Sequence, residues 1–213
     1  HYAMSSYETV VVRVMEEIAE QMPDIEVETV QPFYNDPDYI EALYQSAKPY
    51  LETEFDHLLF SYHGIPARHL SKADSSKGHC RIVKDCCSTC SPAHATCYKA
   101  QTLATTNAFV ARAGLAPEQY SISFQSRLGR EPWLEPYTDF VIPQLVEKGK
   151  KRVLVMTPAF VSDCLETLEE IAMEGKEQFL EAGGESFVAI PCLNEHPAWI
   201  DFLAKRARAC ATE

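Results

Sequence analysis

Residues 152–157 read Arg-Val-Leu-Val-Met-Thr, with four consecutive apolar side chains between two polar ends. A short, fully apolar run of this kind is typical of a strand in a parallel sheet that helices cover on both faces. A second such run, His-Leu-Leu-Phe-Ser-Tyr-His, occupies residues 57–63 and is closed by Gly64 and Pro66. Both runs are flanked by segments with apolar side chains at helical spacing, which predicts alternating strands and helices.

The same patterns extend outward over the whole chain. Strands are predicted at residues 25–33, 57–63, 120–125, 152–157 and 186–190. Helices are predicted at residues 5–22, 37–52, 96–113, 135–148, 163–182 and 197–208. Right-handed crossovers between parallel strands then give an α/β fold with a doubly wound parallel sheet, Rossmann-like or flavodoxin-like. Such sheets bind ligands beyond the carboxyl ends of their strands.

The composition narrows the classes of function. The chain has 213 residues and 46% hydrophobic residues, enough for a packed core, and no apolar run long enough for a membrane-spanning helix. Its net charge of −12 argues against nucleic-acid binding, which needs a basic surface. An acidic surface suits the handling of cations, but on charge alone plain solubility is the preferred explanation. The first residues do not resemble a secretory signal, and their sequence suggests a truncated or processed piece.

Three side chains near predicted strand ends could take part in chemistry. His63 could bind a metal or move a proton near neutral pH, although a lone histidine is more often packed or capping. Glu166 lies where the positive end of a helix dipole favours a carboxylate, which also describes an ordinary first-turn acid. Trp133 could form a flat wall for an aromatic ligand or be part of the core or its rim.

A row of acidic side chains runs along the predicted helix at residues 163–182. At about 100° per residue, spacings of 3, 4, 4, 3 and 4 put them on one helix face. The row consists of Asp163, Glu166, Glu170, Glu174, Glu177 and Glu181. Like charges one turn apart repel, so the row could guide a divalent cation or could be an acidic solvent face.

Three motifs, in this order, resemble those of the ferrochelatase family. Residues 60–66, FSYHGIP, are similar to the family's F-S-x-H-x-x-P motif. Residues 124–127, FQSR, with residues 132–134, PWL, are similar to its W-Q-S and P-W-L segment. Residues 160–168, FVSDCLETL, are similar to its F-x-S-D-H-x-E-T-L segment. The resemblance covers about residues 1–208 and implies a chelatase-type fold and a lyase that inserts Fe(II) into protoporphyrin IX or coproporphyrin III in haem biosynthesis.

The resemblance also implies roles for individual residues. His63 would bind the incoming iron, accept pyrrole protons, or both, and Glu166 would face it as metal ligand or proton acceptor. Trp133 would line the porphyrin pocket. An acidic metal path would continue from the site through Asp163, Glu170 and Glu174. Porphyrin metallation removes two pyrrole protons and needs a metal site that binds Fe(II) only moderately, which imidazole and carboxylate provide.

The chain departs from the family pattern in three places. Cys164 stands where the family often has histidine, and Gly64-Ile65 replaces a commoner Ser-Leu pair. Most of the first of two similar family domains has no counterpart here. Residues 1–193 would then form the second domain, and residues 194–213 a carboxy-terminal helix that packs on the first. Activity is therefore expected of the two-domain enzyme rather than of this piece alone.

Five of the eight cysteines cluster within the predicted insertion at residues 72–97. The cluster reads Cys80-x5-Cys86-Cys87-x2-Cys90-x6-Cys97. Such density indicates a metal site in a reducing compartment, either zinc or [2Fe–2S], rather than a disulfide framework. The chain resembles bacterial ferrochelatases with an internal [2Fe–2S] segment. The predicted ligands are Cys80, Cys87, Cys90 and Cys97, with Cys86 as the spare, His79 and His94 as weaker candidates, and free thiols as the alternative.

Two other functions compete with iron insertion. One is a chelatase for cobalt or another metal and tetrapyrrole, and the other is an iron–sulfur module for sensing or electron transfer. Porphyrin binding or iron insertion would separate the iron chelatase from the iron–sulfur module. Porphyrin and ferrous iron are the expected partners, the cytoplasm is the default location, and a homodimer or peripheral membrane contact stays open.

Overall fold

A computed structural model describes residues 1–211, so the last two residues of the predicted segment 194–213 lie outside the described part. The chain divides into two compact units. Residues 1–34 and 67–104 form the first unit, and residues 35–66 with those from 105 onward form the second. The predicted insertion at residues 72–97 falls within the first unit.

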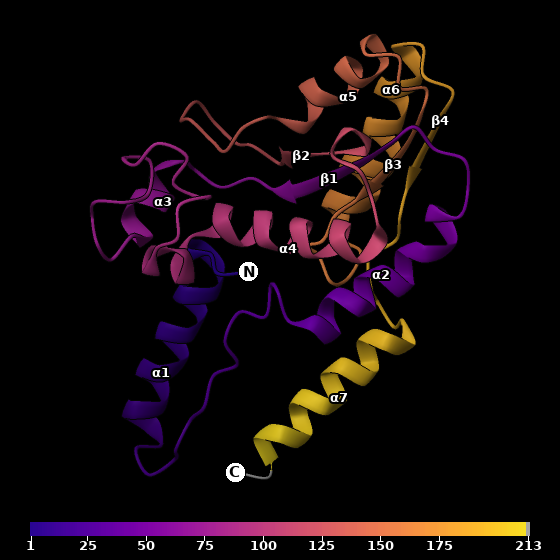
Figure 1. The fold of residues 1–213 in the computed structure, drawn as a ribbon. Coiled ribbons are helices and arrows are strands. Elements are labelled where there is room, and N and C mark those ends of the chain that lie inside the picture. The colour runs from indigo at the N-terminus through magenta and orange to yellow at the C-terminus, as the bar shows by residue number, and fades with distance from the viewer. Residues whose placement is uncertain (212–213) are drawn as a thin grey trace. The chain divides into compact units, whose positions relative to one another are not determined.

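The second unit is built on a four-stranded parallel sheet (Figure 1). Its strands are β1 (His57–His63), β2 (Tyr120–Gln125), β3 (Arg152–Met156) and β4 (Ser186–Ala189), in the spatial order β2-β1-β3-β4. All three pairings are parallel, which confirms the predicted α/β class. β1 and β2 begin and end as predicted, because each is a buried run with a clear boundary at both ends.

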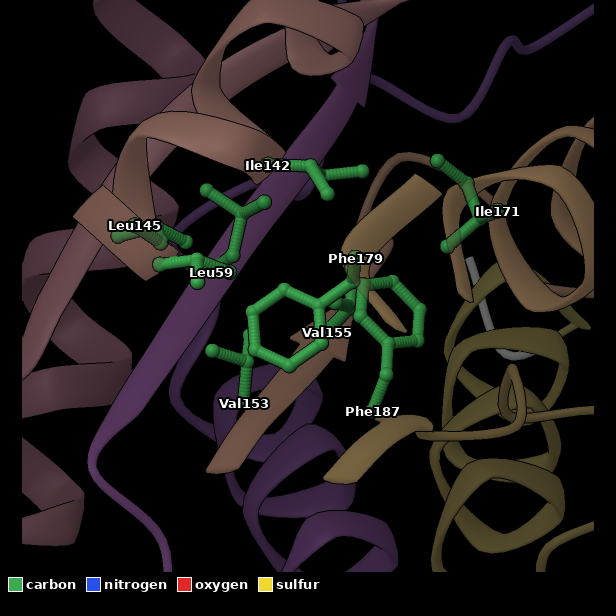
Figure 2. Close-up of a cluster of buried hydrophobic side chains, with 9 residues drawn as sticks. Leu59, Ile142, Leu145, Val153, Val155, Ile171, Phe179 and Phe187 are labelled. Carbon is green, nitrogen blue, oxygen red and sulfur yellow. The ribbon is translucent and has the colours of Figure 1, made fainter. Parts of the chain in front are cut away.

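One face of the sheet is covered by α5 (Thr138–Glu147), the π-helix η4 (Glu166–Gly175) and α6 (Lys176–Glu181). Their apolar side chains meet those of the strands in a core that excludes water (Figure 2). This core contains Leu59, Ile142, Leu145, Val146, Val153, Val155, Ile171, Phe179 and Phe187. Burial of such side chains contributes about 1.5–3 kcal/mol each, so the core holds α5, η4 and α6 against the sheet.

The other face of the sheet packs against α2 (Pro37–Leu51) and the second half of α4 (Tyr98–Ala113). The rings of Phe60 and Phe109 meet edge to face at 5.4 Å, and the Tyr39 hydroxyl donates to the carbonyl of Pro158 at 2.7 Å. Helix α7 (Pro197–Ala211) packs on α2 and leaves Ile200 and Leu203 exposed. Helices on both faces make the sheet doubly wound.

The first unit contains η1 (Met4–Glu8), α1 (Thr9–Gln21), α3 (Arg68–Ala73), η2 (Pro92–Thr96) and the start of α4. The predicted amino-terminal helix is present as η1 and α1, but the predicted strand at residues 25–33 is wrong, because this segment has no strand structure. A strand forms only by pairing with another, and no strand of the described chain pairs with this segment. Helix α1 buries no residue, and Val10 on it is 60% exposed.

The predicted long helix at residues 163–182 is also corrected. It begins at Glu166, and its first ten residues form a π-helix before α6 continues. A tight contact marks the junction: a Cβ added at Gly175 would lie 3.1 Å from Ile142 Cδ1 and 3.3 Å from the Glu170 carbonyl oxygen. π-Helical turns are rare and often occur at functional sites. Within residues 1–211, no helix is long and apolar enough to cross a membrane.

Candidate active site

A cavity of about 1040 Å³ opens in the second unit at the carboxyl ends of β1 and β2. Its walls come from these strand ends, the loop at residues 126–128, α5, η4 and α6. This is the position at which parallel α/β sheets bind their ligands. The volume is at the upper end of the usual range for small-molecule sites.

His63 is the last residue of β1 and lines this cavity. Its Nδ1 lies 2.6 Å from the carbonyl oxygen of Gly64. A carbonyl can only accept a hydrogen bond, so Nδ1 carries the proton and Nε2 holds the lone pair when the ring is neutral. The adjacent glycine is required here, because a Cβ at Gly64 would lie 2.8 Å from the Gln125 carbonyl oxygen.

Glu166 begins η4 and lines the same cavity. A hydrogen bond from the Cys164 thiol, with a smaller contribution from the charge of His63, lowers the pKa of this carboxyl. The pKa of Cys164 is raised, first by burial and then by this bond to Glu166, so its thiol stays protonated as a donor. The structure therefore brings the side chains of His63, Cys164 and Glu166 close to one another.

Glu170 is held by the loop that follows β2. The Ser126 backbone N–H donates to Oε1 at 2.7 Å, and the Ser126 hydroxyl donates to Oε2 at 2.5 Å. Ser126 adopts a left-handed backbone with φ of 63°, which costs energy for a residue other than glycine. The strained turn thus directs two donors at one carboxylate of the predicted acidic row.

Gln125 links the strands to η4 through a buried polar network. Its Nε2 donates to the carbonyl of Glu166 at 2.9 Å, and its Oε1 accepts from the Ser61 hydroxyl at 2.8 Å. Gln125 is 2% exposed and pairs in register with His63. Prediction from the sequence missed the roles of Gln125 and Ser126. The available signal was a pair of polar residues at the end of a buried strand.

The cavity wall is strongly acidic. Its carboxylates are Asp139, Glu166, Glu169, Glu170, Glu174, Glu177 and Glu181. Arg127 is the one lysine or arginine among the lining residues, and it pairs with Asp139 at 2.6 Å. Five of the six predicted acidic residues therefore face one cavity, and Asp163 does not.

Asp163 instead ties the start of η4 to the loop after β4. Its carboxylate accepts hydrogen bonds from Asn194 Nδ2 at 2.6 Å, from Thr167 Oγ1 at 3.0 Å and from the Cys192 backbone at 3.3 Å. Burial alone would raise the pKa of Asp163, but these bonds outweigh it and the pKa is lowered. A carboxylate with three donors is occupied in holding the loop.

Trp133 lies beside the cavity rather than among its lining residues. Its Nε1 donates to the Leu128 carbonyl at 2.8 Å, and residues 66 and 133 form an isolated β-bridge. A Cβ at Gly64 would lie 3.2 Å from Trp133 Cε3, so the indole packs directly against the residue that follows His63.

The cysteine segment belongs to the first unit, and none of its five cysteines forms a disulfide. Cys80 and Cys97 are buried, Cys86 and Cys87 are half-buried, and Cys90 is exposed. Hydrogen bonds from Cys87 and Cys80 help lower the pKa of Cys97 to about 6, while burial, followed by the proximity of Cys97, raises that of Cys80 to about 12. No three His, Cys, Asp or Glu side chains in residues 1–211 are arranged to hold a single metal ion.

Comparison with known proteins agrees with this geometry. The family model described as Ferrochelatase matches residues 1–210. The chain is 64% identical over 208 residues to a ferrochelatase of Opitutus terrae, covering 98% of this chain and 60% of that protein. It is 54% identical over 200 residues to a ferrochelatase of Ectopseudomonas mendocina, covering 93% of this chain and 58% of that protein. The chain thus spans about three fifths of the length of these curated relatives. With an acid-lined cavity at the strand ends and a family match over nearly its whole length, the chain belongs to the ferrochelatase family.

Proposed function

We propose that this protein inserts Fe(II) into a porphyrin, protoporphyrin IX or coproporphyrin III, and so makes haem. The observation that carries the proposal is the placement of His63 and Glu166 in one acid-lined cavity at the carboxyl ends of the strands. The relatives are named ferrochelatases, which supports the same reaction for this chain.

The chemistry assigns each side chain a task. Metallation releases two pyrrole protons and needs a base close to the incoming metal. His63 Nε2 is the base, because Nδ1 is engaged by the Gly64 carbonyl. Glu166, whose lowered pKa keeps it ionised, is the carboxylate ligand or second proton acceptor. A mixed imidazole and carboxylate site binds Fe(II) without the tight hold of thiolates, so the metal can pass to the porphyrin.

The remaining predicted residues take supporting roles in the proposal. Glu170 and Glu174 line the cavity and would carry iron toward Glu166. Asp163, also predicted for this path, would act at its start, through the turn that it anchors before η4. Trp133 would contact the porphyrin from its place beside Gly64.

We also propose that the cysteine segment holds a [2Fe–2S] cluster. The donor set fits, because several thiols gather in one segment and four thiolates are the usual ligands of this cluster. A binuclear cluster has two irons, and each iron is bound by two of the four cysteine ligands. The lack of three side chains around a single metal ion in residues 1–211 therefore does not argue against the cluster. The bound cluster would supply one-electron redox chemistry or rigidity. Cytoplasmic residence is proposed with it, since reduced thiols persist there, and a homodimer or peripheral membrane contact stays a prediction.

The test is anaerobic haem formation, followed optically with the intact protein, porphyrin and Fe(II). The His63→Ala and Glu166→Gln variants are compared with Glu185→Gln, whose side chain lies outside the cavity lining. Wild type and Glu185→Gln should form haem, while the two site variants lose most activity. Parallel reactions with Co(II) test the cobalt alternative. Haem formation that survives both site substitutions would refute the assigned site, and no metallation by any protein sample would refute the chelatase function.

A further inference from the structure

Five clustered cysteines compete for four positions around the proposed cluster. We infer that Cys86, together with Cys80, Cys87 and Cys97, binds the cluster, and that Cys90 lies outside it. This inference rests on the proposed [2Fe–2S] cofactor and replaces the ligand set expected from sequence spacing. It is carried by thiol contacts, burial and backbone hydrogen bonds within the first unit.

The first observation is the set of contacts between thiols. The Cys97 thiol is hydrogen-bonded by both Cys80 and Cys87. The Cys86 thiol contacts that of Cys87 and is close enough to act electrostatically on Cys80. Cys90 takes part in none of these interactions. Four sulfurs therefore gather before any cluster is bound.

The second observation is the pair of histidines that hold the backbone of Cys86. The Nε2 atoms of His79 and His94 lie 2.8 and 2.9 Å from the carbonyl oxygen of Cys86. A carbonyl only accepts, so both rings present an N–H to it. The two rings meet edge to face at 5.4 Å.

These two bonds connect Cys86 with both ends of the cysteine segment. His79 immediately precedes Cys80, and His94 lies three residues before Cys97. Two donors on one carbonyl fix the peptide that joins Cys86 to Cys87. The Nε2 atoms of both imidazoles are engaged as donors to Cys86, so neither Nε2 can bind iron while these bonds last.

Asp74 fixes the Cys80 end of this arrangement. Its carboxylate accepts from the backbone N–H of Cys80 at 2.9 Å and of His79 at 2.8 Å, and it is 1% exposed. Its other oxygen accepts from the backbone and hydroxyl of Ser76 at 2.9 and 2.7 Å. A ligand loop held by a fully bonded carboxylate is preorganised, which lowers the entropy lost on binding the cluster.

Cys90 has the opposite surroundings. It is exposed and follows the turn in which Ser88 and Thr89 donate to the Asp85 carbonyl at 2.8 and 3.2 Å. Cys90 therefore presents an exposed thiol, whereas Cys80 and Cys97 are buried and Cys86 and Cys87 are half-buried.

Single replacements of each cysteine by serine test the assignment in the full chain. Each protein is reconstituted anaerobically with Fe(III) and sulfide, and its iron, acid-labile sulfide, visible absorption and EPR signal after one-electron reduction are measured. Wild type, Cys90→Ser and the control Cys210→Ser, an exposed cysteine outside the segment, should hold about two irons and two sulfides per chain. The other four variants, Cys80→Ser, Cys86→Ser, Cys87→Ser and Cys97→Ser, should lose the cluster.

The outcomes distinguish a wrong ligand assignment from the absence of a cluster. Loss of the cluster in Cys90→Ser with retention in Cys86→Ser would overturn the assignment and leave the cofactor standing. Absence of iron and sulfide from wild type would overturn both, whatever the haem-forming activity. If Cys86→Ser fails to fold, Cys90→Ser alone tests the assignment. A full cluster with four thiolate ligands in that variant would support it, because only Cys80, Cys86, Cys87 and Cys97 then remain in the segment. A metal ion such as zinc, bound by four thiolates without acid-labile sulfide, would also overturn the proposed cluster.

Discussion

Replacement of Gln125 by leucine should destabilise the second unit and disable the proposed site together. Leucine has similar volume but cannot bond the Ser61 hydroxyl or the Glu166 carbonyl, at 2.8 and 2.9 Å in the wild type. A hydrogen bond contributes about 0.5–1.5 kcal/mol net, so the two together predict a loss of about 1–3 kcal/mol. The loss is limited because Ser61 keeps a 2.9 Å bond to Thr138.

The measurement is thermal unfolding followed by circular dichroism, with haem formation measured on the same samples. For a chain of this size 1 kcal/mol corresponds to a few degrees, so the melting temperature should fall by roughly 2–12 °C. Activity should fall as well, because Gln125 sets the position of Glu166 relative to His63 across the cavity. The proposed ligands would no longer be held at a fixed separation.

The matched control is Gln178→Leu. Gln178 donates to the Asp139 carbonyl at 2.7 Å from a more exposed position, where water can replace the lost donor. Its melting temperature should stay within about 1 °C of wild type, since exposed substitutions usually change stability by under 0.5 kcal/mol. Equal stability of Gln125→Leu and wild type would refute the argument that this network holds η4 to the sheet.

Two further predictions concern residues on β1 and directly after it. Gly64→Ala should cost about 1–3 kcal/mol in chemical denaturation, because the new Cβ would lie 2.8 Å from the Gln125 carbonyl; Gly78→Ala, where the nearest atom is 3.7 Å away, is the control and should be near neutral. Burial, followed by the charge of Lys150, lowers the pKa of His57 to about 4, below its unfolded value near 6.5. His57 therefore binds protons more readily when unfolded, and its stabilising contribution, complete above pH 6.5, should be lost as the pH falls from 6.5 toward 4. Denaturation curves of His57→Gln should show a smaller loss over this range, and an unchanged pH dependence would contradict the assignment.

The sheet could be predicted from the sequence because its information is local. The apolar runs at residues 57–63 and 120–125 have sharp ends, and both match the observed strands. The strand predicted at residues 25–33 failed because β-structure also requires a partner, which a local pattern cannot supply. The π-helical form of η4 likewise depends on remote contacts, such as the close approach of Gly175 to Ile142 and Phe187.

The residues of the candidate site also divide into those with a local sequence signal and those that depend on remote contacts. The shared cavity of His63 and Glu166 could be predicted, because an ionisable residue at the end of a parallel strand and another at the start of a helix carry a chemical signal of their own. For Ser126 and Gln125 the only local signal is two polar residues at the end of a buried strand, since their importance comes from a left-handed backbone at one residue and strand register at the other. The proposed choice of Cys86 over Cys90 as a ligand could not be made from cysteine spacing either. It depends in part on which peptide carbonyl His79 and His94 bind.

The carboxylates of the cavity wall differ in how firmly hydrogen bonds hold them. Like charges facing one cavity repel, and each needs a donor, a cation or water nearby. Ser126 supplies two donors to Glu170, and the Cys164 thiol supplies one to Glu166, so these two carboxylates are held in place. Glu174 lines the same cavity without a comparable clamp among the described residues. In the proposed function, the Glu174 side chain would move with a passing cation, whereas Glu166 would receive the cation at a fixed position beside His63.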